Sequence, residues 1–141
     1  MRIIKFRCWD EKKKKMYHNV GISNTGTPML WIDKGGGATF LGDTGKGLPI
    51  LMQYTGLKDK NGKEIWEGDI LHFKGNVYSG TPGEFDKKDM ILPVVYKDNK
   101  GFQMYLIGFC YYEIYSHEVE VIGNIFENKE LLKRIADWKH L

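Results

Sequence analysis

The chain has 141 residues, with 21 Lys or Arg against 18 Asp or Glu, so its formal net charge is +3. This length suits one domain or two small lobes and leaves little room for a two-domain enzyme. Apolar residues make up 42% of the chain, enough to bury a core, which excludes wholesale disorder. We expect no membrane span, since the apolar stretches are short, and no secretory signal, since charged residues begin at Arg2. With only two cysteines, Cys8 and Cys110, reduced thiols in the cytoplasm are the simpler expectation.

Charge is unevenly distributed along the chain. Residues 1–20 hold seven basic and two acidic side chains, whereas residues 113–130 hold five acids and one lysine. The favoured interpretation of the basic run is a solvated hairpin tip, because short like-charge runs are usually exposed. The alternative is a phosphate-binding face. Under that alternative the candidate nucleic-acid-binding residues are Arg2, Lys5, Arg7, Lys12, Lys13, Lys14 and Lys15.

The start of the chain predicts a β-hairpin. Apolar and charged residues alternate from Arg2 to Trp9, which is typical of a half-buried strand. A second strand follows over residues 16–20, beyond a polar turn. Residues 21–47 contain eight glycines, so we predict a long loop or irregular ribbon there.

The middle of the chain predicts short strands joined by tight turns. A strand over residues 48–54 leads to a hairpin that joins residues 55–59 to 64–67. Its turn holds Asn61 and Gly62, a pair that accepts positive φ at both positions. Gly68 and Asp69 form a second turn, feeding a strand that ends at Phe73. Residues 75–90, with Gly and Pro, predict a polar loop.

The last third predicts further strands and one helix. The strands cover residues 93–97, 102–109, 111–115 and 119–125. Apolar residues then recur at helical spacing, which predicts an amphipathic helix over residues 129–139 with Asn128 as N-cap. Since so short a helix is marginal in water, it must pack on the sheet or on another subunit. The whole pattern indicates a mainly β protein, a small antiparallel barrel or sandwich with one terminal helix.

Motifs that carry chemistry are weak. Residues 42–47 superficially resemble a phosphate loop, but Phe40 and Gly47 occupy positions that require other residues. The cysteines and the four histidines are scattered, which disfavours a metal site or an activated thiol. Acid pairs such as Glu118 with Glu120 are better explained by a soluble outer face. We therefore predict no catalytic residues, no metal and no cofactor.

Aromatic residues crowd the stretch from Phe102 to Tyr115. Exposed aromatic rings beside cations can stack on nucleic-acid bases. Few cations lie in this stretch, and nearby acids would repel phosphate. Core packing or a subunit interface is the favoured interpretation.

Three blocks of the sequence, residues 4–10, 53–70 and 119–128, together resemble the YopX family of phage and prophage proteins. The strongest is residues 53–70, from Gln53 through Asn61 and Gly62 to Gly68, Asp69 and Ile70. The opening residues 4–10 and the closing residues 119–128 are similar to the family's start and end. Departures from the family pattern are mild: Cys8, Trp66 and Lys129.

The resemblance implies a mainly β fold with a small SH3-like barrel in the C-terminal part. We accordingly expect an N-terminal β lobe at residues 1–52 with a Gly-rich loop at 21–47, an SH3-like barrel at 53–127 and a C-terminal helix at 128–141. Together they would form one compact unit. The resemblance also implies a phage or prophage gene. The family has no established activity, so the resemblance carries over no catalytic or binding residue.

These observations favour a non-enzymatic phage accessory protein that binds a protein partner or self-assembles, in the cytoplasm of an infected or lysogenic bacterium. The alternative is nucleic-acid binding through the basic N-terminal hairpin. An enzyme is the least favoured class, because it would need a pocket of titratable groups that spacing does not reveal.

Overall fold

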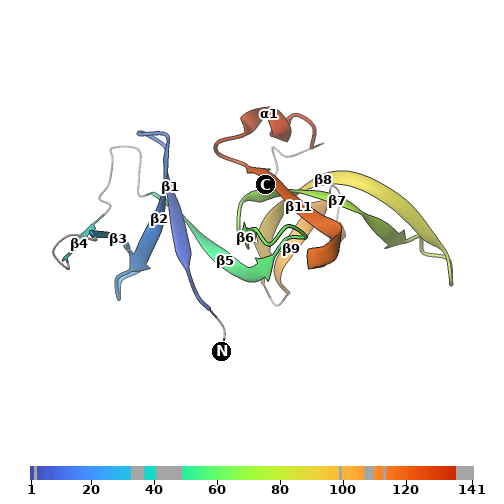
Figure 1. The fold of residues 1–141 in the computed structure, drawn as a ribbon, viewed down its shortest axis with the longest axis horizontal. Helices are drawn as coiled ribbons and strands as arrows, with labels where there is room; N and C mark the ends of the chain where they lie inside the picture. The colour runs from blue at the N-terminus through green and yellow to red at the C-terminus, as the bar shows by residue number, and fades with distance from the viewer. Residues whose placement is uncertain are drawn as a thin grey trace. The chain divides into compact units, whose positions relative to one another are not determined.

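The computed structural model describes residues 1, 3–32, 37–40, 49–98, 100–106, 110–112 and 114–135. Its fold is mainly β, with two antiparallel sheets and one four-residue helix. The chain divides into two compact units, Met1–Gly56 and Leu57–Leu141 (Figure 1). The described elements are β1 (Phe6–Asp10), β2 (Lys15–Ile22), β3 (Pro28–Ile32), β4 (Gly37–Phe40), β5 (Ile50–Lys58), β6 (Glu64–Trp66), β7 (Asp69–Tyr78), β8 (Phe85–Lys97), β9 (Gly101–Leu106), β10 (Cys110–Tyr112), the 3-10 turn η1 (Ser116–Glu118), β11 (Val119–Asn124) and α1 (Lys129–Leu132).

The predicted N-terminal hairpin is confirmed. Strands β1 and β2 are antiparallel, with Phe6 opposite Val20 and Trp9 opposite Met16. The strand begins at Phe6 and not at Arg2, while Ile3 and Ile4 ahead of it are exposed. Strand β5 pairs along the other edge of β1, with Trp9 opposite Ile50. Both edges of β1 are therefore hydrogen-bonded, and β1 is an interior strand of its sheet.

The prediction of a long loop or irregular ribbon over residues 21–47 is wrong at residues 28–32 and 37–40, which form β3 and β4. β3 pairs with β2, and β4 pairs with β3, so the hydrogen-bonded order of this sheet is β4-β3-β2-β1-β5-β6. Backbone pairing between chain neighbours forms these short strands although glycines weaken the side-chain pattern. Residues 33–36 and 41–48, which include the rejected phosphate loop, lie outside the described residues.

The turn after β5 forms where expected but with a different geometry. Only Gly62 of the Asn-Gly pair has positive φ, at +82°. Its N–H donates to the Asp59 carbonyl at 2.9 Å, and the Asp59 N–H donates to the Lys63 carbonyl at 2.8 Å. This pattern needs left-handed backbone at a single position, which glycine supplies without steric cost.

The prediction of a polar loop over residues 75–90 is also wrong. β7 continues to Tyr78 and β8 starts at Phe85, and their pairing runs unbroken from Ile70↔Pro93 to Tyr78↔Phe85. Only residues 79–84 form the turn, where Ser79 N–H donates to the Glu84 carbonyl at 3.1 Å. Apolar and polar residues alternate along a strand only where one of its faces is buried. Because this hairpin extends past the strands beside it, neither of its faces had to be apolar.

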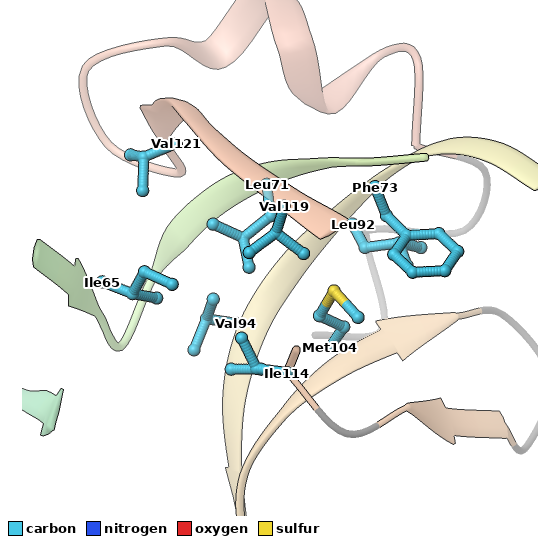
Figure 2. Close-up of a cluster of buried hydrophobic side chains, with 9 residues drawn as sticks. All are labelled: Ile65, Leu71, Phe73, Leu92, Val94, Met104, Ile114, Val119 and Val121. Atoms are coloured by element: carbon cyan, nitrogen blue, oxygen red, sulfur yellow. The ribbon is translucent and has the colours of Figure 1, made fainter. Parts of the chain in front are cut away.

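The second sheet has the order β10-β9-β8-β7-β11. Hydrogen bonds between described residues leave it open, with β10 and β11 at its two ends, so the SH3-like barrel remains a prediction. A core of nine buried residues, shown in Figure 2, combines side chains of this sheet with two from outside it, Ile65 and Ile114: Ile65, Leu71, Phe73, Leu92, Val94, Met104, Ile114, Val119 and Val121. Leu71 and Phe73 of β7 point into this core, whereas Ile70 beside them points to the opposite face and is buried in a second cluster.

The terminal helix is present but shorter than predicted. α1 covers Lys129–Leu132, and residues 136–141 lie outside the described residues. Leu132 and Ile135 pack with Ile70 in a second buried cluster, which confirms that the helix packs on the sheet. Asn128 precedes the helix, yet its side chain does not cap it. Instead the Asn128 side-chain oxygen accepts a hydrogen bond from the Asn124 N–H at 3.1 Å.

Candidate functional site

The basic N-terminal hairpin presents four lysines at one turn. Lys12 to Lys15 are all exposed. Asp10 organises this turn, since its Oδ1 accepts hydrogen bonds from the backbone N–H groups of Lys12 and Lys13, both at 3.0 Å. Lys14 takes a left-handed φ of +52°, and its ammonium pairs with Glu11. The four lysines therefore lie close together because the chain reverses its direction at this turn.

The other predicted cations of this end lie apart from the turn. Arg7 is only 6% exposed, so its side chain is largely withdrawn from the surface. The Lys5 ammonium lies 5.0 Å from the centre of the Tyr54 ring, and the Lys15 ammonium lies 4.9 Å from the Tyr17 ring, both within cation–π range. Arg2 lies outside the described residues. The structure thus groups Lys12–Lys15 and separates them from Arg7.

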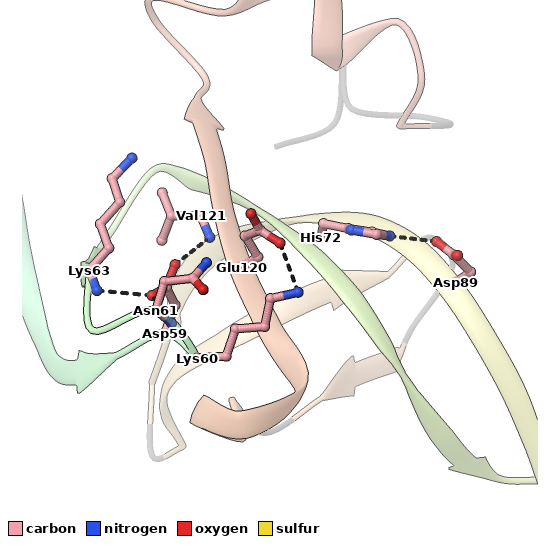
Figure 3. A network of polar contacts seen from close by, with 8 residues as sticks. All are labelled: Asp59, Lys60, Asn61, Lys63, His72, Asp89, Glu120 and Val121. Atoms are coloured by element: carbon pink, nitrogen blue, oxygen red, sulfur yellow. Dashed lines mark hydrogen bonds and ion pairs between the residues drawn. The ribbon is translucent and has the colours of Figure 1, made fainter.

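The turn after β5 holds a buried carboxylate, Asp59, which sequence reasoning did not single out. Asp59 is 6% exposed. Its Oδ1 accepts hydrogen bonds from the N–H groups of Asn61 and Lys63, and its Oδ2 from that of Val121, all at 2.9 Å (Figure 3). Burial alone would raise the pKa of Asp59, but these three donors and the Lys63 charge hold it below its ordinary value. Asp59 is therefore ionised, and both of its carboxylate oxygens accept hydrogen bonds from the backbone.

This same turn covers the outer edge of β11. Val121 N–H is satisfied by Asp59, and Lys60 N–H donates to the Val119 carbonyl at 3.1 Å. The Lys60 ammonium also pairs with Glu120 at 2.8 Å (Figure 3). An uncovered strand edge invites pairing with other chains. By covering the outer edge of β11, the turn prevents such pairing there.

The second predicted turn has the expected chemistry. Gly68 has a φ of +80°, and Asp69 accepts a hydrogen bond from Trp66 N–H at 2.8 Å. The Gly68 N–H donates to the Val94 carbonyl, and its own carbonyl accepts from Ile125 N–H. One glycine thus joins β8 to the segment after β11, which is a structural role.

The hairpin of β7 and β8 extends past its neighbours. β11 pairs with β7 only from Asp69 to Phe73, and β9 pairs with β8 only from Val94 to Lys97. Figure 1 shows the two strands running on together beyond β11. We call residues 74–89 of this hairpin the arm. Among the arm residues whose side chains are described, 74–76 and 79–89, none belongs to either buried cluster.

A cleft of about 380 Å³ lies along the base of the arm. It is lined by Lys74, Gly75, Asn76, Lys87, Lys88, Asp89 and Glu118. The Glu118 carboxyl group lies directly over Gly75, because a Cβ added there would come within 2.9 Å of Glu118 Cδ. The cleft therefore has cations from both strands of the arm and one carboxylate from η1.

Two of the charged groups at the cleft have partners on the arm or next to it. His72 Nε2 lies 2.6 Å from Asp89 Oδ1 (Figure 3). The hydrogen bond with His72 lowers the pKa of Asp89, as do the charges of His72 and Lys74, while desolvation acts in the opposite direction. The Lys88 ammonium lies 3.4 Å from Asp86. Neither pair was foreseen: the His72–Asp89 contact depends on the register of β7 and β8, and Asp86 and Lys88 share a face of β8 in a segment where the sequence predicts a loop.

A family model described as YopX protein matches residues 5–133. The chain belongs to the YopX family. The crystal structure of protein EF1440 from Enterococcus faecalis is similar, with 29% identity and a TM-score of 0.63, over 94% of this chain and 99% of that chain. No curated protein matches the chain.

The YopX signature block is explained here by folding. Its turn residues in this chain make hydrogen bonds within the fold: Asp59 and Gly68 reach β11 and the segment after it, whereas Gly62 and Asp69 close local turns. None of these four residues lines the cleft at the arm. In this YopX-family chain the residues of the signature block, 53–70, are therefore not the residues that line the cleft.

Metal and thiol chemistry have little support in the described residues. Within them, no group of three His, Cys, Asp or Glu side chains is placed to hold a metal ion. Cys8 is fully buried, and burial with the nearby Asp10 charge raises its pKa to about 11, which opposes an activated thiolate. No helix in the described ranges is long and apolar enough to cross a membrane. Most of the aromatic stretch, residues 105–113, lies outside the described side chains.

Proposed function

We propose that this YopX-family protein is a non-enzymatic binding module that engages a protein partner or self-assembles. We also propose that it is encoded by a phage or prophage and acts in the cytoplasm of the bacterial host. The observation that carries the proposal is the arm. The arm residues with described side chains, 74–76 and 79–89, lie outside both buried clusters, so this part of the hairpin adds exposed surface and little core. An element of this kind is better explained by contact with another molecule than by folding.

The test measures assembly state and partner capture together. Light scattering gives the mass of the purified chain, and chemical cross-linking in the bacterial host, followed by affinity purification, identifies any partner. We expect a mass above the monomer or one reproducible cross-linked protein. A monomer that cross-links to nothing would contradict the proposal.

A second candidate function is nucleic-acid binding at the N-terminal hairpin. The observation in its favour is that Lys12–Lys15 are exposed together at one turn. Fluorescence anisotropy with labelled DNA and RNA at two salt concentrations tests it, because phosphate contacts weaken steeply with salt. The double variant Lys12→Glu/Lys13→Glu should abolish such binding, and an absence of binding at low salt would exclude this function.

We do not propose a catalytic role. The cleft at the arm holds lysines, an amide and two carboxylates, with His72 facing outward to Asp89. Catalysis by such groups would need a nucleophile or base aimed at a common point, and the contacts described above do not supply one.

We retain an SH3-like barrel as a proposal for residues 53–127. A solution structure with backbone hydrogen bonds between the end strands of the second sheet would support it.

A further inference from the structure

The outer edge of β8, the side of that strand turned away from β7, has no strand beside it along most of its length. β9 pairs with β8 only from Val94 to Lys97. From Phe85 to Leu92, the sheet order of the described residues places no strand on this side, whereas β7 pairs along the other side. This segment also contains no proline that would interrupt a ladder. An open edge of this kind can pair with another strand.

The register of the arm decides which backbone groups face outward. Ser79 N–H donates to the Glu84 carbonyl, so this pair is hydrogen-bonded. Hydrogen-bonded and non-hydrogen-bonded pairs alternate along an antiparallel ladder, which directs the N–H and C=O groups of the even-numbered β8 residues toward β7. The groups that point outward are those of the odd-numbered residues Phe85, Lys87, Asp89 and Ile91. The side chains of these residues share one face of the sheet.

Two copies of this edge match each other in one antiparallel register. Where Lys87 lies opposite Asp89 of a second copy, Phe85 lies opposite Ile91 of that copy, and the two-fold axis repeats both pairs. Each pair exchanges two backbone hydrogen bonds, and opposite charges or apolar side chains directly opposite one another add stability. Phe85 is 64% exposed, and Ile91 packs at the margin of the buried cluster around Ile70. The contact would therefore cover an exposed ring.

Other registers of the same two edges are unfavourable. Sliding the second copy by two residues places Lys87 opposite Lys87 or Asp89 opposite Asp89, and like charges directly opposite one another are destabilising. Sliding it by one residue sets outward backbone groups against inward ones. In the favoured register the two Lys88 side chains meet at the axis, on the other face. Each has its own Asp86 within 3.4 Å and Asp86 of the second copy diagonal to it, so the charges there alternate.

The outer edge of β7 offers no such match. Beyond Phe73 this strand carries one charged residue, Lys74, and no acid. Two copies of the β7 edge therefore cannot place opposite charges across from one another. The self-complementary edge of the arm is that of β8.

We propose that two copies of this chain dimerise through the outer edges of their β8 strands, with Lys87 of each copy opposite Asp89 of the other. This inference rests on the proposed binding function and names its surface and its partner, a second copy of the chain. The two arms then form one four-stranded ribbon, in the order β7-β8-β8-β7. The hydrogen bond from His72 holds the Asp89 carboxylate on the face where this contact forms.

The test measures mass against protein concentration by light scattering, with the full chain and two charge variants. Lys87→Glu puts two acids opposite each other, and Asp89→Lys puts two lysines opposite each other, so each variant alone should raise the dimer dissociation constant at least about tenfold. Mixed in equal amounts, the two variants regain opposite charges at both contacts of a heterodimer. The mixture should therefore dimerise within about threefold of the natural chain.

The mixture also controls for folding, because a variant that had lost its fold could not recover by mixing. Lys12→Glu makes the same charge change as Lys87→Glu at the N-terminal hairpin and should leave dimerisation unchanged. Amide exchange gives a second measurement. The N–H groups of Lys87 and Asp89 should exchange more slowly as the concentration rises, whereas that of Asn76, on the β7 edge, should not change.

A natural chain that stays monomeric, a dimer indifferent to the charge variants, or a mixture that does not recover would each overturn the inference. The proposed function survives these results if the chain cross-links to a host protein or assembles through another surface. A monomer that cross-links to nothing removes both.

Discussion

At the scale of single residues, Asp59 is a buried carboxylate that connects two segments of the second unit that are distant in sequence. Its two carboxylate oxygens accept three backbone hydrogen bonds, one of them from Val121, 62 positions away in the chain. Removing an acceptor from buried donors is more costly than losing an exposed hydrogen bond. The residue therefore joins the β5–β6 turn to β11.

Asp59→Asn should lower the free energy of unfolding by about 1–3 kcal/mol, because the amide NH2 faces a backbone N–H that then has no acceptor. Urea denaturation followed by circular dichroism measures this loss. Asp98→Asn, in the exposed turn after β8, is the matched control and should change stability little. Equal effects of the two variants would show that the three hydrogen bonds contribute nothing.

The lowered pKa of Asp59 predicts that the stability of the fold falls in acid. Its pKa in the folded chain is below the ordinary value of 3.8, so the unfolded chain binds its proton first. The stabilisation from Asp59 is complete above the unfolded pKa and is lost as pH falls through the folded pKa. Unfolding midpoints measured down to about pH 3 should fall less steeply with acid in Asp59→Asn than in the natural chain. If the unfolding midpoints of the two chains fell equally steeply with acid, the lowered pKa of Asp59 would be contradicted.

Sequence reasoning singled out Asp69 and missed Asp59. Asp69 was identified because its hydrogen bond to Trp66 N–H is local, three positions away. Asp59 was missed because its third donor comes from β11, and only the fold brings that strand near. Arg7 likewise appeared as a surface cation from the sequence, and its burial depends on the pairing of β1 on both edges.

At the scale of elements, the arm is the feature that most distinguishes the structure from the expectation of a loop. A strand with both faces in solvent has no alternating pattern to detect. Lys87, Lys88 and Asp89 are polar on successive positions of β8, which the sequence alone presents as a loop. The ladder with β7 is set by the turn at residues 79–84, where Ser79 and Glu84 close the register.

Amide hydrogen exchange should show the arm as a paired ribbon. Alternation from the Ser79–Glu84 pair directs the N–H groups of Gly75 and Lys88 inward and those of Asn76 and Lys87 outward. We expect slower exchange at Gly75 and Lys88 than at Asn76 and Lys87 in NMR experiments on the monomer at low concentration. Uniformly fast exchange over residues 74–89 would show that the arm is not formed in solution.

At the scale of the whole molecule, both buried clusters belong to residues 57–141. The nine-residue cluster runs from Ile65 to Val121, and the smaller one joins Ile70 to Leu132 and Ile135. All of these residues lie in the second compact unit. A unit with its own core is expected to fold by itself.

A fragment of residues 57–141 should therefore unfold cooperatively in urea, with a β-type circular dichroism spectrum, whereas the fragment of residues 1–56 should be markedly less stable because so short a chain buries little surface. Equilibrium denaturation of the two fragments and of the full chain measures the difference. A non-cooperative transition in residues 57–141 would show that its core needs the first unit.

The sequence by itself determined the mainly β class, the positions of most turns, the terminal helix and the family, because these depend on local backbone preferences and on short blocks of residues. Strand pairing was decided only in three dimensions, since the backbone hydrogen bonds of a ladder do not require an alternating side-chain pattern. That is why the arm, its cleft and the buried Asp59 emerge from the tertiary structure: the arm lacks such a pattern, and the cleft and the Asp59 contacts include residues far along the chain, such as Glu118 and Val121.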